Sequence, residues 1–346
     1  MEPSNAVAEV PEHNVTGMDY ALRSHLVYSG PPIIDVHAHV LQTRPTDPKE
    51  GPPPAYGPGA TTDQASTMLE AAGEFGICRV YSMCFPDDIK PLRERLGDRI
   101  AFIGSIQKKL DEPDDVAYRL LDRFLQQGIE LLKFWSAPRG RERGLFVDAP
   151  WRIETAKRAR EAGIRTIMVH VSDPDAWFRT TYADTAKFGT KRDQYVGLER
   201  MLHLFPDMTW IGAHMGGDPE HPDHLQALLE QYPNLHFDTS ATKWQVREVS
   251  RRREDVRKLI TKHPGRFLFG SDLVTRHHLV REHYVSRYWG QRTLWESDWQ
   301  GQSPIADPDY KAESGEQSPM LRGLSLPADV LAQIYHHNVS RLLDLG

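Results

Sequence analysis

The segment that decides the fold is Pro31-Pro32-Ile33-Ile34-Asp35-Val36-His37-Ala38-His39-Val40. Its apolar residues predict a short buried strand, on which residues two apart point to the same face. His37 and His39 therefore project together from the end of this strand. Two imidazoles that converge in this way can hold one metal ion, although His-x-His also occurs by chance where polar residues leave a strand. The rest of the chain decides between these two interpretations.

Seven further apolar segments follow, and helical stretches separate them. The strand candidates are residues 77–83, 100–106, 129–134, 165–170, 208–214, 235–239 and 266–272, and the helix candidates are residues 62–73, 113–127, 150–163, 193–204, 221–232 and 245–263. Because most of these strands are apolar on both faces, they are typical of buried parallel strands. The alternation predicts an α/β fold, a (β/α)8 TIM barrel with its active site at the carboxyl ends of the strands. An open doubly wound sheet would be expected to carry a glycine-rich phosphate turn after its first strand, where this chain has His-x-His.

We expect two parts in the chain: an N-terminal extension over residues 1–30 and a barrel domain over residues 31–346. A short helix is predicted in the extension at about residues 17–27. After the last strand we expect C-terminal helices, with a polar loop over residues 300–326 and a closing helix over residues 327–344.

Three longer loops are predicted over the mouth of the barrel. Residues 41–60 are too rich in proline and glycine for a helix or a central strand, and they would form a rim or lid. Residues 136–149 and 172–192 would lie over the same mouth.

The composition limits the classes of function. The 346 residues carry 42 basic and 48 acidic side chains, a net charge of −6, so a basic surface for nucleic acid is not expected. Cys78 and Cys84 are the only cysteines, which excludes a disulfide scaffold and suits a reducing compartment. The sequence starts without a signal-peptide pattern, and no apolar run reaches the roughly 20 residues of a membrane span. We therefore expect a cytoplasmic enzyme-sized domain without a nucleic-acid or membrane partner.

Polar residues occur at the ends of several predicted strands. They are His37 and His39 after the first strand, Lys133 near the end of the fourth, His170 at the fifth, His214 at the sixth and Asp272 at the eighth. Each has an ordinary alternative, such as a core histidine, an ion-paired lysine or a helix-capping aspartate. Because barrel strands open together at one mouth, their joint occurrence there predicts a metal site.

These motifs closely resemble the amidohydrolase superfamily, and more narrowly its amidohydrolase-related branch. That branch contains aminocarboxymuconate semialdehyde decarboxylase, resorcylate-type decarboxylases and several lactone hydrolases. The resemblance covers about residues 31–346 and rests on Asp35-Val36-His37-Ala38-His39, Val169-His170, Gly212-Ala213-His214-Met215-Gly216-Gly217, Phe237-Asp238-Thr239-Ser240, Phe269-Gly270-Ser271-Asp272 and Ile334-Tyr335-His336-His337-Asn338-Val339-Ser340-Arg341-Leu342. The motifs are specific for the fold and the metal, and weak for the substrate.

The resemblance implies a ligand set for one divalent metal. The ligands would be His37, His39, His170 and Asp272, with zinc expected and manganese or iron as alternatives. His214 would lie beside the metal, where it could polarise a substrate carbonyl or take part in proton transfer. Asp272 would accept a proton from the activated water and deliver it to a leaving group.

Lys133 leaves two hypotheses open. In binuclear relatives, a lysine from the fourth strand is carboxylated and bridges two metals. Alternatively, the cation of Lys133 binds an anionic group of the substrate. We favour a single essential metal and the second role.

Residues in the predicted loops indicate an anionic, small-molecule substrate. Arginine binds carboxylates in a two-pronged geometry, and tryptophan supplies a flat apolar wall. The candidates are Trp135, Arg139, Arg141 and Arg143 after the fourth strand, Trp244 and Arg247 after the seventh, and Arg276 with the adjacent His277 and His278 after the eighth. We expect only one or two of the arginines to touch substrate. The sequence leaves open whether the chain forms a homo-oligomer.

Three functions fit this pattern. We favour a metal-dependent hydrolase of a small carboxylated ester, lactone or amide. The alternative is a metal-dependent, non-oxidative decarboxylase of an aromatic or unsaturated acid, since both reactions can use the same ligands. The third is a catalytically silent barrel that serves as a binding scaffold, against which the complete ligand set argues.

Overall fold

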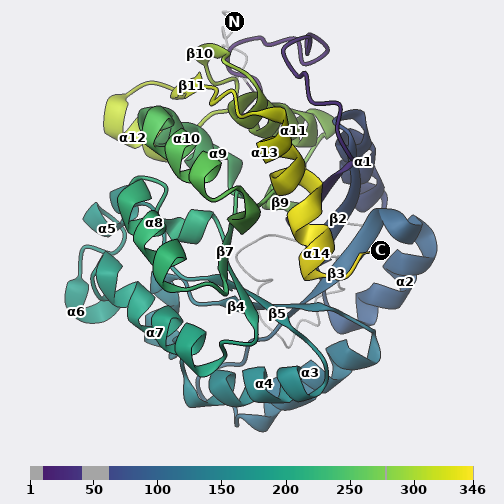
Figure 1. Ribbon diagram of the computed structural model, residues 1–346, viewed down its shortest axis with the longest axis vertical. Helices are drawn as coiled ribbons and strands as arrows, with labels where there is room; N and C mark the ends of the chain where they lie inside the picture. The colour runs from purple at the N-terminus through teal and green to yellow at the C-terminus, as the bar shows by residue number, and fades with distance from the viewer. Residues whose placement is uncertain (1–10, 41–61, 277–278, 346) are drawn as a thin grey trace, which may run out of the picture.

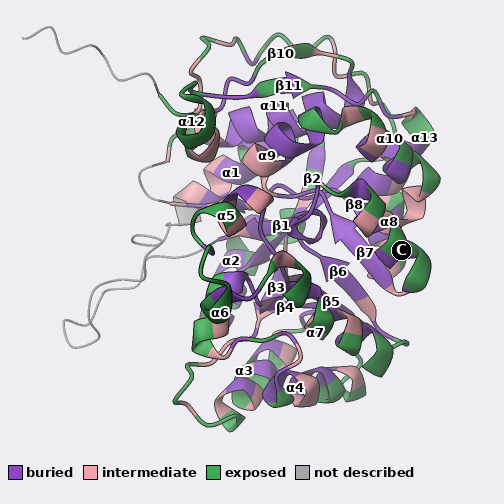
Figure 2. Ribbon diagram, turned by 90° about the vertical axis from the view of Figure 1, so that its left-hand side faces the viewer, coloured by how far each residue is buried: buried purple, intermediate pink, exposed green. Residues whose placement is uncertain are grey.

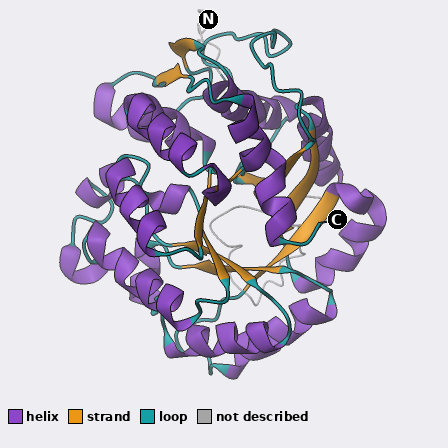
Figure 3. Ribbon diagram, viewed as in Figure 1, coloured by secondary structure: helices purple, strands orange, loops and turns teal. Residues whose placement is uncertain are grey.

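A computed structural model describes residues 11–40, 62–276 and 279–345 (Figure 1). Its centre is a parallel sheet, whose strands lie inside a ring of helices (Figure 3). The strands are β1 (Ile33–His39), β2 (Ile77–Met83), β3 (Ile100–Ser105), β4 (Leu131–Trp135), β5 (Thr166–His170), β6 (Thr209–Gly212), β7 (Leu235–Asp238), β8 (Phe267–Leu268) and β9 (Leu273–Val274). All eight predicted strands are present, and β8 with β9 make up the eighth.

The eighth strand closes the barrel. The sheet order runs from β8 through β7 down to β1 and then to β9. Leu268 of β8 is paired with Asp238 of β7, whereas Leu273 of β9 is paired with Ala38 of β1. Because residues 269–272 alone separate β8 from β9, one continuous segment joins both ends of the sheet. The (β/α)8 barrel is therefore confirmed.

The helices that follow the strands largely match the prediction. They are α1 (Thr62–Glu74), α2 (Pro86–Leu96), α3 (Asp115–Gln126), α4 (Pro150–Glu161), α5 (Asp175–Arg179), α6 (Thr185–Phe188), α7 (Lys191–Leu204), α8 (Pro222–Gln231), α9 (Thr242–Trp244), α10 (Arg253–Lys262), α11 (Arg281–Glu296), α12 (Pro308–Ser314), α13 (Ala328–Ala332) and α14 (Asn338–Leu342). The predicted helix over 245–263 is interrupted, since a π-helical turn over Gln245–Val249 precedes α10. A second π-helical turn, Gln333–His337, divides the predicted closing helix between α13 and α14.

Apolar residues form two cores, and Figure 2 shows the strands buried between exposed helix faces. The larger core packs the outer faces of the strands against the helices. The smaller one joins Val36, Leu131, Met168 and Ile211 of four strands to Val339 of α14. Since its members come from the strands and the closing helix, this core fills the barrel interior and α14 seals it.

The N-terminal extension differs from the prediction. Residues 11–30 contain turns and no helix, so the helix predicted at 17–27 is wrong. The segment packs along α11 instead, where the ring of Tyr20 lies 5.8 Å from that of Trp289. His25 Nε2 also lies 2.9 Å from Thr293 Oγ1. Contacts with α11 therefore replace the hydrogen bonds of a local helix.

Residues 297–327 form an excursion between α11 and α13, where a polar loop was predicted. Its strands β10 (Gln300–Gln302) and β11 (Met320–Arg322) pair antiparallel, and α12 lies between them along the chain. Among the described helices, none combines the length and apolar character that crossing a lipid bilayer requires. The lid predicted over residues 41–60 lies outside the described residues.

Candidate metal centre

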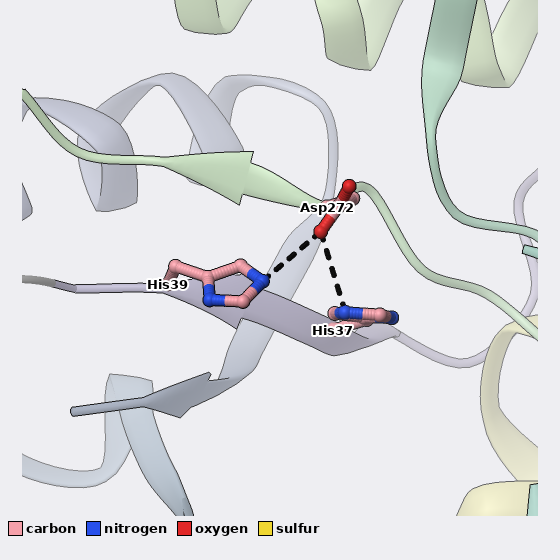
Figure 4. Close-up of side chains that lie close together, drawn as sticks. All are labelled: His37, His39 and Asp272. Atoms are coloured by element: carbon pink, nitrogen blue, oxygen red, sulfur yellow. Dashed lines mark hydrogen bonds and ion pairs between the residues drawn. The ribbon is translucent and has the colours of Figure 1, made fainter. Parts of the chain in front are cut away.

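The break in the eighth strand places a carboxylate over the His-x-His pair (Figure 4). Asp272 has a φ of 58°, in the left-handed region that aspartate tolerates better than most residues. Its backbone N–H donates to the carbonyl of His37 at 2.7 Å. As a result, Asp272 Oδ1 lies 3.0 Å from His39 Nε2 and 3.3 Å from His37 Nε2.

A second carboxylate orients His37. Asp238, at the end of β7, is fully buried, and its Oδ2 lies 2.8 Å from His37 Nδ1. Burial raises the pKa of Asp238, but the hydrogen bond with His37 and the neighbouring cation of Lys133 lower it below the usual range. Burial and the neighbouring Lys133 in turn lower the pKa of His37, which is therefore a neutral imidazole. With Nδ1–H donated to Asp238, the lone pair of His37 is on Nε2, facing Asp272.

These three side chains fit a divalent metal. The ligand atoms of His37, His39 and Asp272 all lie within 4.8 Å of one another. A neutral imidazole nitrogen beside a carboxylate oxygen brings two electron-pair donors together, an arrangement that a cation stabilises. Lys133 Nζ lies 2.6 Å from His37 Nε2, so a side chain of the protein already places a cation beside these donors. The donor set is therefore one that could hold a divalent metal.

Lys133 lies deep in the barrel. Burial lowers the pKa of Lys133 to about 8, although Asp272 and Asp238 oppose this effect. Its contact with His37 puts it among the predicted metal ligands, which both hypotheses for this lysine allow.

His170 lies beside this group. Its Nε2 is 2.8 Å from Asp173 Oδ1, and Asp173 Oδ2 accepts a hydrogen bond from the Tyr182 hydroxyl at 2.7 Å. None of the compact ligand groups found in the described residues includes His170. Because Asp173 binds Nε2 of His170, Nδ1 is the nitrogen of this ring that could bind a metal. The role of His170 as a metal ligand stays a prediction.

Contacts fix both the ring and the backbone of His214. Its ring stacks on His37 at 4.9 Å, and its backbone N–H donates to Asp238 Oδ1 at 2.8 Å. His214 Nδ1 lies 2.7 Å from Ser240 Oγ. Burial lowers the pKa of His214 well below its usual value, so its ring is neutral. Asp238 and Ser240 were not among the predicted site residues, although their motif had been noted.

The predicted substrate residues separate into two groups. The indole of Trp244 lies 5.4 Å from the ring of His214, and that of Trp135 lies 6.4 Å from His170. Arg139 is exposed, with its guanidinium 5.3 Å from the ring of Trp177. The two indoles border the histidines, whereas Arg139 lies beside Trp177.

Arg247 is placed differently. It is buried, and it forms ion pairs with Glu248 and Asp307. Arg276 lies half-buried two residues after β9, and His277 and His278 lie outside the described residues. A substrate contact by Arg247 or Arg276 remains a prediction that the geometry does not support directly.

Comparison with known proteins identifies the family. A sequence model described as Amidohydrolase matches residues 34–345. The chain belongs to the amidohydrolase family. Members of this family are enzymes that bind a divalent metal, and His37, His39 and Asp272 are a group in this chain that could hold one. No curated protein matches the chain in sequence.

Solved structures share the barrel at low identity. A 2,6-dihydroxybenzoate decarboxylase in complex with 2,6-dihydroxybenzoate is 16% identical, with a TM-score of 0.54, over 91% of this chain and 99% of the other. A 5-carboxyvanillate decarboxylase of Novosphingobium aromaticivorans with bound manganese is 11% identical, with a TM-score of 0.52, over 91% and 97%. An organophosphorus hydrolase of Deinococcus radiodurans is 15% identical, with a TM-score of 0.52, over 90% and 93%. At these identities the similarity shows the fold and leaves the reaction unresolved.

Proposed function

We propose that this protein is a metal-dependent hydrolase of a small carboxylated ester, lactone or amide. The observation that carries the proposal is the ionised carboxylate of Asp272 in contact with both imidazoles of the His-x-His pair. His37, His39, His170 and Asp272 would hold one divalent metal, for which we propose zinc. Such a metal supplies a water whose pKa is lowered to about 7.

Asp272 is suited to the role of proton acceptor. Its Oδ1 lies 3.0 Å from His39 Nε2 and 3.3 Å from His37 Nε2, beside the atoms that would hold the metal. Its side chain is 30% exposed, so it faces the space into which a substrate would enter. A positioned carboxylate of this kind can take a proton from the attacking water and pass it to the leaving group.

The hydrogen-bond network supports a specific proposal for His214. The hydroxyl of Ser240 donates to Asp238, so Ser240 Oγ accepts the Nδ1–H of His214. The Nε2 of His214 therefore carries a lone pair. In this tautomer His214 accepts a proton or a hydrogen bond, and it cannot polarise a carbonyl by donating one.

Decarboxylation of an aromatic or unsaturated acid is the second candidate. The flat indoles of Trp135 and Trp244 beside the histidines favour it, as does the shared fold with two decarboxylases. In that reaction Asp272 would protonate the carbon that loses carbon dioxide. Asp272 lies against two imidazole nitrogens that could share a metal with it, which suits the activation of water, so we place hydrolysis first.

The two candidates can be separated in one experiment. Protein stripped with a chelator and reloaded with zinc, manganese or iron is incubated with ester, lactone, amide and aromatic-acid libraries in H₂¹⁸O. Hydrolysis is expected to put ¹⁸O into a carboxylic acid product without release of carbon dioxide. Metal-dependent release of carbon dioxide without cleavage by water would reject the hydrolase in favour of the decarboxylase. Absence of metal-dependent turnover in all libraries would count against both.

A further inference from the structure

Trp244 and Trp177 form a row of indole rings beside the histidines, which we call the aromatic wall. Trp244 borders the rings of His214 and His170 at 5.4 and 6.2 Å. Trp177 of α5 contacts Trp244 in turn, with ring centres 5.3 Å apart and planes at 80°. Trp177 is therefore the next ring out from the metal centre.

The orientation of Trp177 is fixed from the C-terminal excursion. Its Nε1–H donates to Asp309 Oδ2 at 2.9 Å, across 132 positions of sequence. Asp309 belongs to α12, which lies outside the βα loops that normally build the mouth of a barrel. Since an indole has a single donor, this bond sets the rotation of the ring.

Two other groups hold Trp177. The guanidinium of Arg139 lies 5.3 Å from its ring centre, a cation–π arrangement. Its edge meets Tyr182 at 5.9 Å, and Tyr182 is joined to His170 through Asp173. The position of Trp177 thus sets the length of the aromatic wall. It also sets the position of Arg139 relative to the metal centre.

We propose that Asp309 is a positioning residue that fixes Trp177 as the outer wall of the substrate site, and that this wall selects flat carboxylates over puckered ones. The inference rests on the proposed function, because it takes the histidine cluster as the place of reaction. A ring held at its N–H presents a constant flat face for stacking, and Arg139 beside it suits a carboxylate.

The anchoring is tested with three variants of α12. Asp309→Ala removes the acceptor, whereas Asp309→Asn keeps an acceptor oxygen and should rescue the contact. Glu313→Ala is the matched control, since Glu313 ties the same helix to Arg179 and Arg251 at 3.1 Å each without touching the indole. The readout is the indole ¹H–¹⁵N resonance of Trp177, assigned by its loss in Trp177→Phe, which needs neither metal nor substrate. We expect this resonance to shift in Asp309→Ala and to stay near its place in the other two.

The selection is tested by calorimetric titration of the metal-loaded protein with 2,6-dihydroxybenzoate and cyclohexanecarboxylate. The wild type should prefer the planar acid, and Asp309→Ala and Trp177→Ala should weaken that binding roughly tenfold while Asp309→Asn does not. An unshifted resonance in Asp309→Ala, an equal loss in Glu313→Ala, or a wild type that does not prefer the planar acid would overturn the proposal. If these results are as expected but no library compound is turned over, the proposed function is rejected and the proposal for Asp309 and Trp177 is retained.

Discussion

Asp238→Asn is the substitution whose effect the structure defines most closely. Asp238 accepts His37 Nδ1–H through Oδ2, and the backbone N–H groups of His214 and Ser240 through Oδ1, at 2.8, 2.8 and 3.0 Å. An asparagine has a single acceptor oxygen, which can replace Oδ1. Its amide nitrogen would then face His37 and donate to Nδ1. The proton of His37 would move to Nε2, the atom that faces Asp272.

The magnitude follows from these contacts. Loss of an outer partner that orients a ligand histidine lowers metal affinity by about 10–100-fold. A hydrogen bond to a charged carboxylate is also replaced by one from a neutral amide, which should lower the free energy of unfolding of the metal-free protein by about 1–1.5 kcal/mol. Chelator competition measures the first effect and urea unfolding the second. Asp207→Asn, at a carboxylate 56% exposed, is the matched control and should change neither.

The pH dependence gives an independent check. Since His37 holds the pKa of folded Asp238 below the unfolded value of about 3.9, the carboxylate stabilises the fold above that pH. This contribution is lost as the pH falls through the folded pKa. The difference in unfolding free energy between wild type and Asp238→Asn should therefore be full at pH 7 and shrink below about pH 4. A metal affinity within twofold of wild type would refute the assignment of Asp238 as the partner that sets the tautomer of His37.

Three further predictions concern the metal and its neighbours. The double variant His37→Ala, His39→Ala should bind no metal tightly after desalting, as measured by elemental analysis, and a retained full equivalent would exclude the ligand set. Asp272→Asn should stay folded and lose about two orders of magnitude or more in turnover, so that near-normal turnover of the metal-loaded variant would reject its role in proton transfer. Lys133→Ala should keep about one metal equivalent and bind substrate roughly 10–100-fold more weakly, as a lost contact of about 1.5–3 kcal/mol implies. Two metals in the wild type, with one lost in Lys133→Ala, would instead establish the carboxylated bridge.

Local patterns in the sequence predicted the barrel well, and they failed where distant segments decide the structure. The helix α2 was not predicted, although Pro86 occupies the first turn, where proline is tolerated, and Ile89 and Leu92 are buried. The helix expected at 17–27 did not form because that segment packs on α11.

The same distinction applies to the site. The proximity of His37, His39 and Asp272 could be predicted because the first and eighth strands carry them, and the barrel brings the carboxyl ends of its strands together. Arg247 also follows a strand, but it is drawn into an ion pair with Asp307, 60 positions away. Trp177 carries no local signal at all, because its place at the mouth depends on Asp309.

The interruption at residues 269–272 would couple the folding of the barrel to the binding of a metal. The segment that unites the first and last strands is also the one that carries Asp272, so the carboxylate meets the two imidazoles only when the ring of strands is complete. A chain with an open ring would retain His37 and His39 without their carboxylate partner. Metal should therefore bind the closed state preferentially and stabilise it by about 2.7 kcal/mol at a hundred times its dissociation constant. Metal affinity would then report on closure of the ring of strands. Mutations in the segment that joins β8 to β9 and β1 should weaken both metal affinity and closure.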